Sequence, residues 1–143
     1  MAVETTNTVG ALLIDGDGRV LLGLRSRSKK VWPDHWDTIG GRVEAGETLE
    51  AALVREVQEE IGVTPTRFEL IATVRERQPE RYGEMLHHIY AVTQWSGGAP
   101  ANVCDEHSEL RWFEIAEMRR LVNIVDCDYP HLAQCAIERM RQP

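Results

Sequence analysis

Long apolar segments and paired cysteines are both missing from this 143-residue chain. The run from Ala11 to Ile14 is as long as any uninterrupted apolar run, whereas a membrane-spanning helix needs about 20 such residues. The three cysteines, Cys104, Cys127 and Cys135, are odd in number and form no C-x-x-C pair, so we expect free thiols in a reducing compartment. The first residues lack the basic segment of a signal peptide. The cytoplasm is therefore the expected location, without membrane contact.

A basic stripe is missing as well. The net charge is −7, and residues 41–63 hold six Glu against two Arg, so more than half of the excess negative charge lies in this one segment. Binding to duplex nucleic acid relies on neutralising phosphates with a basic surface, so nucleic acid is not an expected partner. Fourteen of the 16 basic residues are Arg, a side chain that suits bidentate contact with phosphate.

The acidic segment reads G-R-V-E-A-G-E-T-L-E-A-A-L-V-R-E-V-Q-E-E-I-G-V and predicts a glycine-rich bend followed by a helix. At about 100° per residue, Glu56 and Glu60 lie within about 40° of each other, and Glu59 lies about 60° to one side. An apolar stripe adjoins this acidic sector, formed by Leu49, Leu53, Val57 and Ile61. Crowded, partly buried carboxylates repel one another unless a cation neutralises them. Oxygen ligands favour Mg²⁺, with Mn²⁺ as a substitute, over zinc.

A glutamate-rich helix alone is usually a solvated helix face. Here the acids stand in a fixed frame: Gly41, Glu47, the pair Arg55-Glu56, the pair Glu59-Glu60 and Gly62 fall at the spacings G-x5-E-x7-R-E-U-x-E-E-x-G-U, where U is aliphatic. This pattern matches the Nudix box without a departure, so the chain resembles the Nudix hydrolases. The flanking segments fit the family too, with Gly40-Gly41 at the box entry and Asp105 to Phe113 as an acid-rich segment closing on aromatic residues.

The resemblance implies a set of roles. Glu56, Glu59 and Glu60 would hold the metal together with the carbonyl of Gly41, Glu47 would support the site, and Arg55 would orient the glutamates. The general base varies within the family, and the candidates here are Glu59, Glu109 and Glu106. Predicted substrate-binding residues are Arg25, Trp36, Arg42 and Tyr90, two of them aromatic side chains that could stack on a base. Many members of the family dimerise, so a homodimer is a possible partner state for this chain.

The rest of the chain predicts one mixed α/β domain over residues 1–143. Residues 8–14 and 19–25 read as a hairpin around two D-G turns, and strands are expected at 68–76, 86–95 and 110–113. Thr48 and Gly62 should cap the box helix, with further helices at 115–121 and from Asp128 onward, where Leu132, Ala136 and Met140 share a face. The Nudix fold, a mixed sheet sandwiched between helices, looks like that.

The expected reaction is metal-dependent hydrolysis of a phosphoanhydride in a nucleoside diphosphate linked to another group. The segment 102–112 resembles the corresponding loop of nucleoside triphosphate pyrophosphatases, including those acting on oxidised nucleotides, so release of a nucleoside monophosphate and pyrophosphate is favoured. Pro79 lies 16 residues beyond Val63, where ADP-ribose pyrophosphatases carry a marker proline, which keeps nucleotide sugars as an alternative. A non-catalytic nucleotide-sensing module is the alternative of another class.

Overall fold

The computed structural model describes residues 5–142. Seven strands and four helices follow in chain order: β1 Thr6–Ile14, β2 Val20–Arg25, β3 Trp36–Asp37, β4 Ile39–Arg42, α1 Leu49–Ile61, β5 Thr64–Arg75, α2 Pro79–Tyr82, β6 Met85–Ser96, β7 His107–Phe113, α3 Ile115–Arg119 and α4 Tyr129–Met140. The predicted opening hairpin and the predicted long strands are present. The short elements β3 and α2 were not predicted, and β7 begins three residues before the predicted strand.

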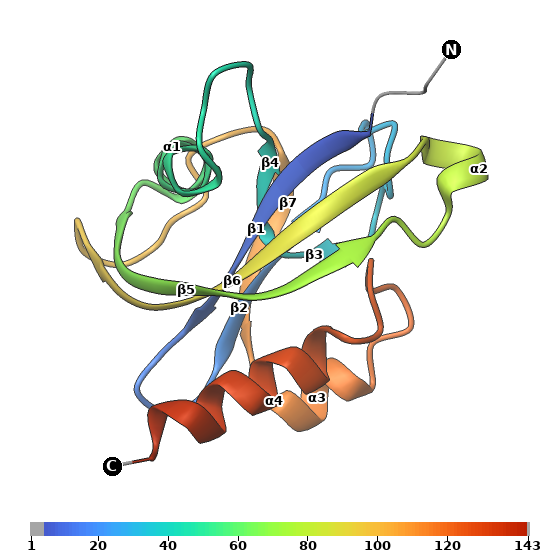
Figure 1. The fold of residues 1–143 in the computed structure, drawn as a ribbon. Coiled ribbons are helices and arrows are strands. Elements are labelled where there is room, and N and C mark those ends of the chain that lie inside the picture. Colours follow the sequence, from blue (N-terminus) through green and yellow to red (C-terminus); the bar gives the residue numbers. More distant parts are fainter. Residues whose placement is uncertain (1–4, 143) are drawn as a thin grey trace.

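Strand β1 lies at the centre of a mixed sheet (Figure 1). It runs parallel to β6 and antiparallel to β4 along its first half, and at its end it pairs with β2. β5 continues the sheet beyond β6, while β2 carries β3 and β7 on the other side. β1 therefore lies between β6 on one edge and β4, which leads into the acidic helix, on the other.

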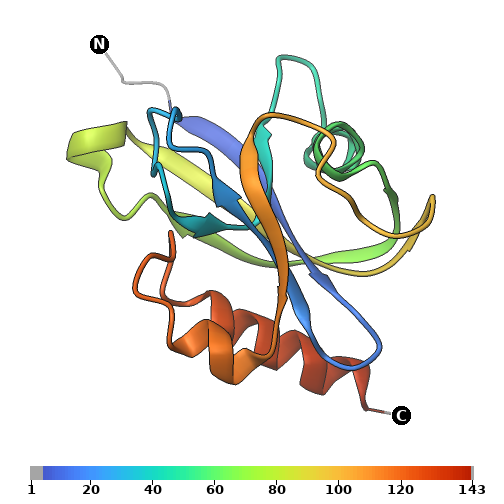
Figure 2. The same cartoon turned by 180° about the vertical axis from the view of Figure 1, so that it is seen from behind.

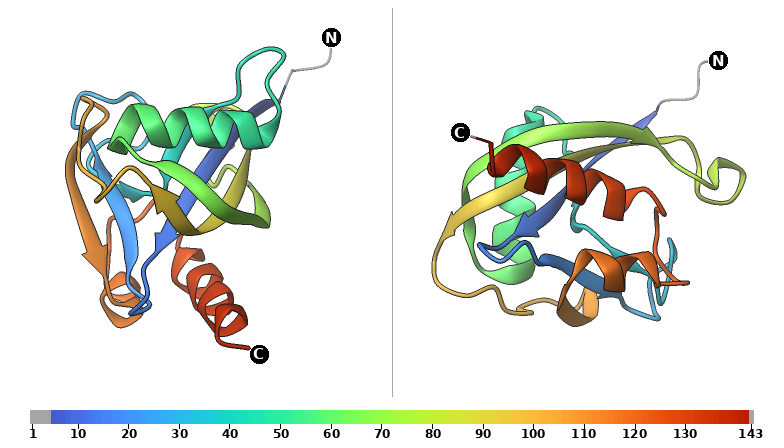
Figure 3. Two further views of the ribbon diagram at one scale, coloured as in Figure 1. Left: turned by 90° about the vertical axis from the view of Figure 1, so that its left-hand side faces the viewer. Right: turned by 90° about the horizontal axis from the view of Figure 1, so that it is seen from below.

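Helices cover both sides of this sheet. α1 packs on one side with a core that includes Leu53, Val57 and Ile61, and α3 and α4 pack on the other with a core that includes Phe113 and Met118. The views in Figure 1 and Figure 3 show α1 separated from α3 and α4 by the strands, and Figure 2 shows β7 on the rear side. The predicted mixed sheet between helices is confirmed.

Helix α1 begins and ends where its caps predict. Thr48 has an extended backbone, and its hydroxyl accepts a hydrogen bond from the amide of Ala51. Gly62 ends the helix with φ 73°, a left-handed conformation that glycine adopts without a steric penalty. These two caps fix the register of α1 and hence the directions of its glutamates.

Helix α4 buries a different stripe from the predicted one. Ala136 is buried as predicted, but Met140 is 45% exposed and the stripe continues through Ala133 and Ile137. The helical repeat fits the predicted stripe and the observed stripe equally well. The observed one faces the sheet, and it also contains the buried Tyr129. Over residues 5–142, none of the helices is long and apolar enough to cross a membrane.

Candidate active site

The acidic segment forms a loop and helix organised around Arg55. The guanidinium donates from Nε and Nη2 to the two carboxylate oxygens of Glu47, at 2.7 and 2.8 Å. Nη1 donates to Glu56 at 2.9 Å and to Glu59 at 3.3 Å, and Nη2 also reaches the carbonyl of Arg42 at 3.1 Å. The hydrogen bond from Arg55 lowers the pKa of Glu47 to about 2. Arg55 thus ties together the loop, the end of β4 and the helix.

The three box glutamates differ in exposure. The Glu60 side chain is 4% exposed, that of Glu56 15%, and that of Glu59 59%. Burial raises the pKa of Glu60, and the neighbouring Glu56 carboxylate raises it further. Carboxylates at this depth are held ionised only by a positive partner. The acidic cluster therefore has an inner pair, Glu56 and Glu60, and an outer member, Glu59.

The inner pair fits a divalent cation. Glu60 Oε2 is buried and lacks a hydrogen-bond partner among residues 5–142. Gly41 lies against Glu56, because a Cβ added at this glycine would lie 2.7 Å from Glu56 Oε1. Carboxylate and carbonyl oxygens are the donors that Mg²⁺ and Mn²⁺ accept. The unpaired oxygen of Glu60 and the close approach of the Gly41 backbone to Glu56 thus suit such an ion.

Three potential metal-ligand atoms lie within 4.8 Å of one another at a place outside the acidic segment. In the described part of the chain these are Asp126, Cys127 and Asp128. Their carboxylates are occupied by Arg77, whose Nη2 lies 3.0 Å from Asp126 and 2.6 Å from Asp128. This group is a salt bridge that joins the segment before α4 to the end of β5. In the box, Nη1 of Arg55 contacts both Glu56 and Glu59, and no such group of three ligand atoms is found there among the described residues.

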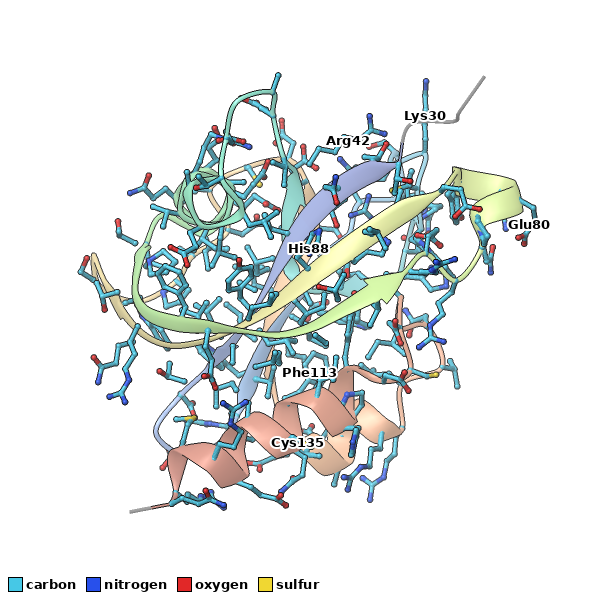
Figure 4. The ribbon with its side chains drawn as sticks, in the orientation of Figure 1. Lys30, Arg42, Glu80, His88, Phe113 and Cys135 are labelled. Carbon is cyan, nitrogen blue, oxygen red and sulfur yellow. The ribbon has the colours of Figure 1, made fainter. Side chains whose placement is uncertain are left out.

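A cavity of about 520 Å³ opens beside the end of β4 and helix α1. Its lining is mixed: the cationic residues are Arg25, Lys29, Lys30 and Arg42, the acidic residues are Asp37, Glu56, Glu76 and Glu106, and the apolar residues include Val9, Met85, Ile89 and Val125. Arg25 is paired with Asp37 and Lys29 with Glu106. Glu56 lines the same cavity. In Figure 4, Arg42 and Lys30 lie at one end of the molecule, next to the first residues of β1. The cavity therefore offers cationic, acidic and apolar side chains next to Glu56.

The predicted substrate-binding residues have different outcomes. Arg25 and Arg42 line the cavity, although Arg25 already donates to the carbonyl of Val31 at 2.7 Å. Trp36 is 6% exposed and packs edge-on against Phe113 in the core beneath α3 and α4. Tyr90 is 4% exposed and belongs to the core beneath α1. Because both rings are buried, neither has a face free for a ligand. The prediction that Trp36 or Tyr90 stacks on a base is therefore corrected: both pack in the core.

The candidate general bases lie in different places. Glu106 lines the cavity and forms an ion pair with Lys29, which lowers the pKa of Glu106. Glu109 lies on β7, opposite Leu24, with an exposed side chain. Neither Glu109 nor Glu59 is among the described residues that line the cavity. Their roles as bases stay predictions.

Three cavity residues were not predicted as site residues. Glu76 is buried at the end of β5 and accepts hydrogen bonds from the Trp32 indole at 3.1 Å and from His87 at 3.0 Å. The other ring nitrogen of His87 lies 2.6 Å from the hydroxyl of Thr8. Trp32 has φ 49°, a left-handed backbone conformation unusual for a tryptophan. That strained tryptophan precedes Pro33, but nothing in the sequence indicates that it would meet a glutamate 44 residues later.

Comparisons with known proteins agree with this geometry. A family model described as NUDIX domain matches residues 4–135. The CTP pyrophosphohydrolase of Escherichia coli is 35% identical over 105 residues, which are 73% of this chain and 73% of that protein. The oxidized purine nucleoside triphosphate hydrolase of Danio rerio is 33% identical over 113 residues, which are 78% and 68% of the two chains. A MutT NUDIX hydrolase structure from Burkholderia pseudomallei has a TM-score of 0.78 at 26% identity, covering 92% of this chain and 98% of that one.

Proposed function

Because the chain belongs to the NUDIX family, we propose that it hydrolyses nucleoside triphosphates to a nucleoside monophosphate and pyrophosphate in a Mg²⁺-dependent reaction. The observation that carries this proposal is the buried Glu60 and the partly exposed Glu56 on one helix, with Gly41 against Glu56, at the edge of a cavity whose lining includes Arg42 and Lys30. Relatives named for CTP and for oxidised purine nucleoside triphosphates support a nucleotide substrate.

The metal would be held by Glu56, Glu60 and the backbone of Gly41. When bound, Mg²⁺ draws charge from the phosphate oxygens and makes water acidic enough to attack phosphorus. Arg55 orients Glu56 by the hydrogen bond at 2.9 Å and fixes the loop through Glu47. The cations of the cavity wall are suited to the remaining phosphate charge.

Glu59 is the proposed general base. Its contact with Arg55, at 3.3 Å, is longer than those of Glu47 and Glu56. Its side chain is also 59% exposed, so it can turn without breaking a buried contact. Glu106 is the less suitable base, because its ion pair with Lys29 favours the ionised form and weakens it as a proton acceptor.

The nucleoside would lie against apolar residues of the cavity such as Met85 and Ile89, with Trp32 as the aromatic wall. The indole is held by its hydrogen bond to the buried Glu76 carboxylate, at 3.1 Å, so its ring plane is fixed before a ligand arrives. A fixed ring lowers the ordering cost of stacking a base. This wall replaces the role that was expected of Trp36 and Tyr90.

The test is a substrate panel with product identification. The protein, at neutral pH with excess Mg²⁺, is incubated with nucleoside triphosphates, their oxidised forms and ADP-ribose. We expect pyrophosphate as the phosphorus product and a higher kcat/KM for triphosphates than for ADP-ribose. Glu56→Gln and Glu60→Gln should lower kcat severely, with Glu50→Gln, on the exposed start of α1, as a matched control. A preference for ADP-ribose would replace the substrate class, and binding without turnover would favour a sensing module.

We also propose that the chain forms one domain and acts in the cytoplasm. Free cysteines support a reducing compartment, because Cys104, Cys127 and Cys135 are unpaired thiols in the structure. Size-exclusion chromatography with light scattering tests whether the chain forms a homodimer.

A further inference from the structure

Glu60 has a direct partner on a strand that is distant in sequence. His107, the first residue of β7, has a side chain only 2% exposed, and its Nε2 lies 2.6 Å from Glu60 Oε1. This contact joins residues 47 positions apart. Among residues 5–142, the other ring nitrogen, Nδ1, has no hydrogen-bond partner. The imidazole is thus buried with a single polar contact, to the innermost glutamate of the box.

A β-bulge aims His107 at this glutamate. Side chains alternate along a strand, and Leu110 and Trp112 pack on the core beneath α1 whereas Phe113 lies in the opposite core. Uninterrupted alternation would therefore turn Ser108 toward α1 and His107 away. The pairing of β2 with β7 shifts between Leu24 and Arg25, so that Ser108 is the extra residue. The shift reverses the alternation and directs His107 to the side of α1.

Gly23 provides the space that the imidazole occupies. A Cβ added at Gly23 would lie 2.4 Å from His107 Nδ1, closer than non-bonded atoms approach. The backbone of Gly23 is not in a left-handed conformation, since the glycines with positive φ are Gly18, Gly46, Gly62, Gly83, Gly97 and Gly98. The requirement for glycine here is therefore the volume of the imidazole and not the backbone angle.

The hydrogen-bond pattern selects one tautomer. A buried N–H group without an acceptor is costlier than a bare ring nitrogen, so the proton belongs on Nε2 and Nδ1 carries the lone pair. His107 then donates from Nε2 to Glu60 Oε1 and occupies that oxygen. The carboxylate keeps Oε2, which has no partner among the described residues, for another ligand.

We propose that His107 is a positioning residue that holds Glu60 Oε1 so that Oε2 is presented to a divalent cation, with Gly23 and the bulge at Ser108 as the features that place the imidazole. This inference rests on the proposed metal-dependent function, and it assigns a role to residues outside the 41–63 segment. Partners that orient a metal ligand by hydrogen bonding typically contribute about 10–100-fold to metal affinity.

The experiment measures Mn²⁺ binding to the full chain, without nucleotide, by electron paramagnetic resonance of the free ion. His107→Leu removes the donor, His107→Gln keeps an N–H donor, and Gly23→Ala displaces the imidazole while leaving both polar groups in place. We expect about 10–100-fold weaker binding for His107→Leu and Gly23→Ala, and substantial recovery for His107→Gln. The matched control is Gly16→Ala, where an added Cβ has nothing within 4 Å, and we expect its Mn²⁺ affinity to equal that of wild type.

The outcomes separate positioning from packing. If His107→Leu does not fold, as judged by circular dichroism in chelator, Gly23→Ala decides by itself. Unchanged affinity in the folded variants overturns the proposal, and so does an equal loss in His107→Leu and His107→Gln, since packing alone would then explain the contact. A wild-type protein that binds no Mn²⁺ overturns this inference. A wild-type protein that binds Mn²⁺ but leaves every nucleotide intact refutes the proposed function alone.

Discussion

Replacing Arg55 by Lys should destabilise the protein although the positive charge is kept. The guanidinium makes a two-pronged contact with Glu47 and separate contacts with Glu56 and Glu59, and an ammonium at that position can keep about one of them. Charge-assisted hydrogen bonds between groups with little exposure contribute about 1.5–3 kcal/mol each, and exposed ones under about 1 kcal/mol. The Arg55 side chain is 24% exposed, so we expect a net loss of about 2 kcal/mol.

Urea unfolding at pH 7 in chelator measures this loss without a contribution from bound metal. A decrease of about 2 kcal/mol corresponds to a Tm about 6–8 °C lower in a domain of this size. Arg19→Lys is the matched control, because Arg19 also contacts a carboxylate, that of Asp15, but is 45% exposed and should change stability by less than about 0.5 kcal/mol. An Arg55→Lys protein as stable as Arg19→Lys would refute the idea that the fork of Arg55 holds the box loop to the helix.

Three further outcomes follow from the structure. Trp32→Ala should raise KM for the nucleotide about 10-fold with little change in kcat, since stacking contributes about 1–3 kcal/mol per base, and steady-state kinetics with an unchanged KM would exclude the ring as the wall. The pKa of Glu47 is lowered from 4.5 to about 2, so its contribution to stability is complete above pH 4.5 and is lost as the pH falls through 2. In Glu47→Gln this pH-dependent loss of stability should be missing from an acid unfolding curve followed by circular dichroism. Identical acid unfolding curves for wild type and Glu47→Gln would contradict the prediction. Gly62→Ala should cost about 1–2 kcal/mol in urea unfolding because of its φ of 73°, and a neutral result would show that the helix end can rearrange.

The features that the sequence predicts well are local ones. The ends of α1 follow from the hydroxyl of Thr48 and the left-handed Gly62, each of which acts within four residues of the helix end. The opening hairpin follows from the D-G turns between two apolar runs, and its strands pair at Leu13 and Leu21. The grouping of Glu56 with Glu60 needs only the helical repeat. In each case, the residues that determine the structure are neighbours in the chain.

The cavity could not be predicted in the same way, because its walls come from distant segments. Trp32 lies on a loop, Glu76 directly after β5 and His87 on β6, and only the sheet brings them together. Aromatic side chains in strand-like sequence do not reveal which one faces a cavity. The structure buries Trp36 and leaves Trp32, four residues earlier, in the cavity wall. The left-handed backbone at Trp32 turns the chain at this point, and no local pattern predicts such a conformation for a tryptophan.

The direction of His107 shows why counting residues along a strand is insufficient near a functional site. Strict alternation from Phe113 gives Arg111, Glu109 and His107 one face, so the sequence alone would place His107 on the side of α3 and α4. One extra residue, Ser108, reverses that assignment, because strand alternation has a period of two. The reversal also requires space for the imidazole on the partner strand, and Gly23, which pairs with Leu110, provides it. A bulge on one strand and a glycine on its neighbour must therefore occur together for the imidazole to reach Glu60.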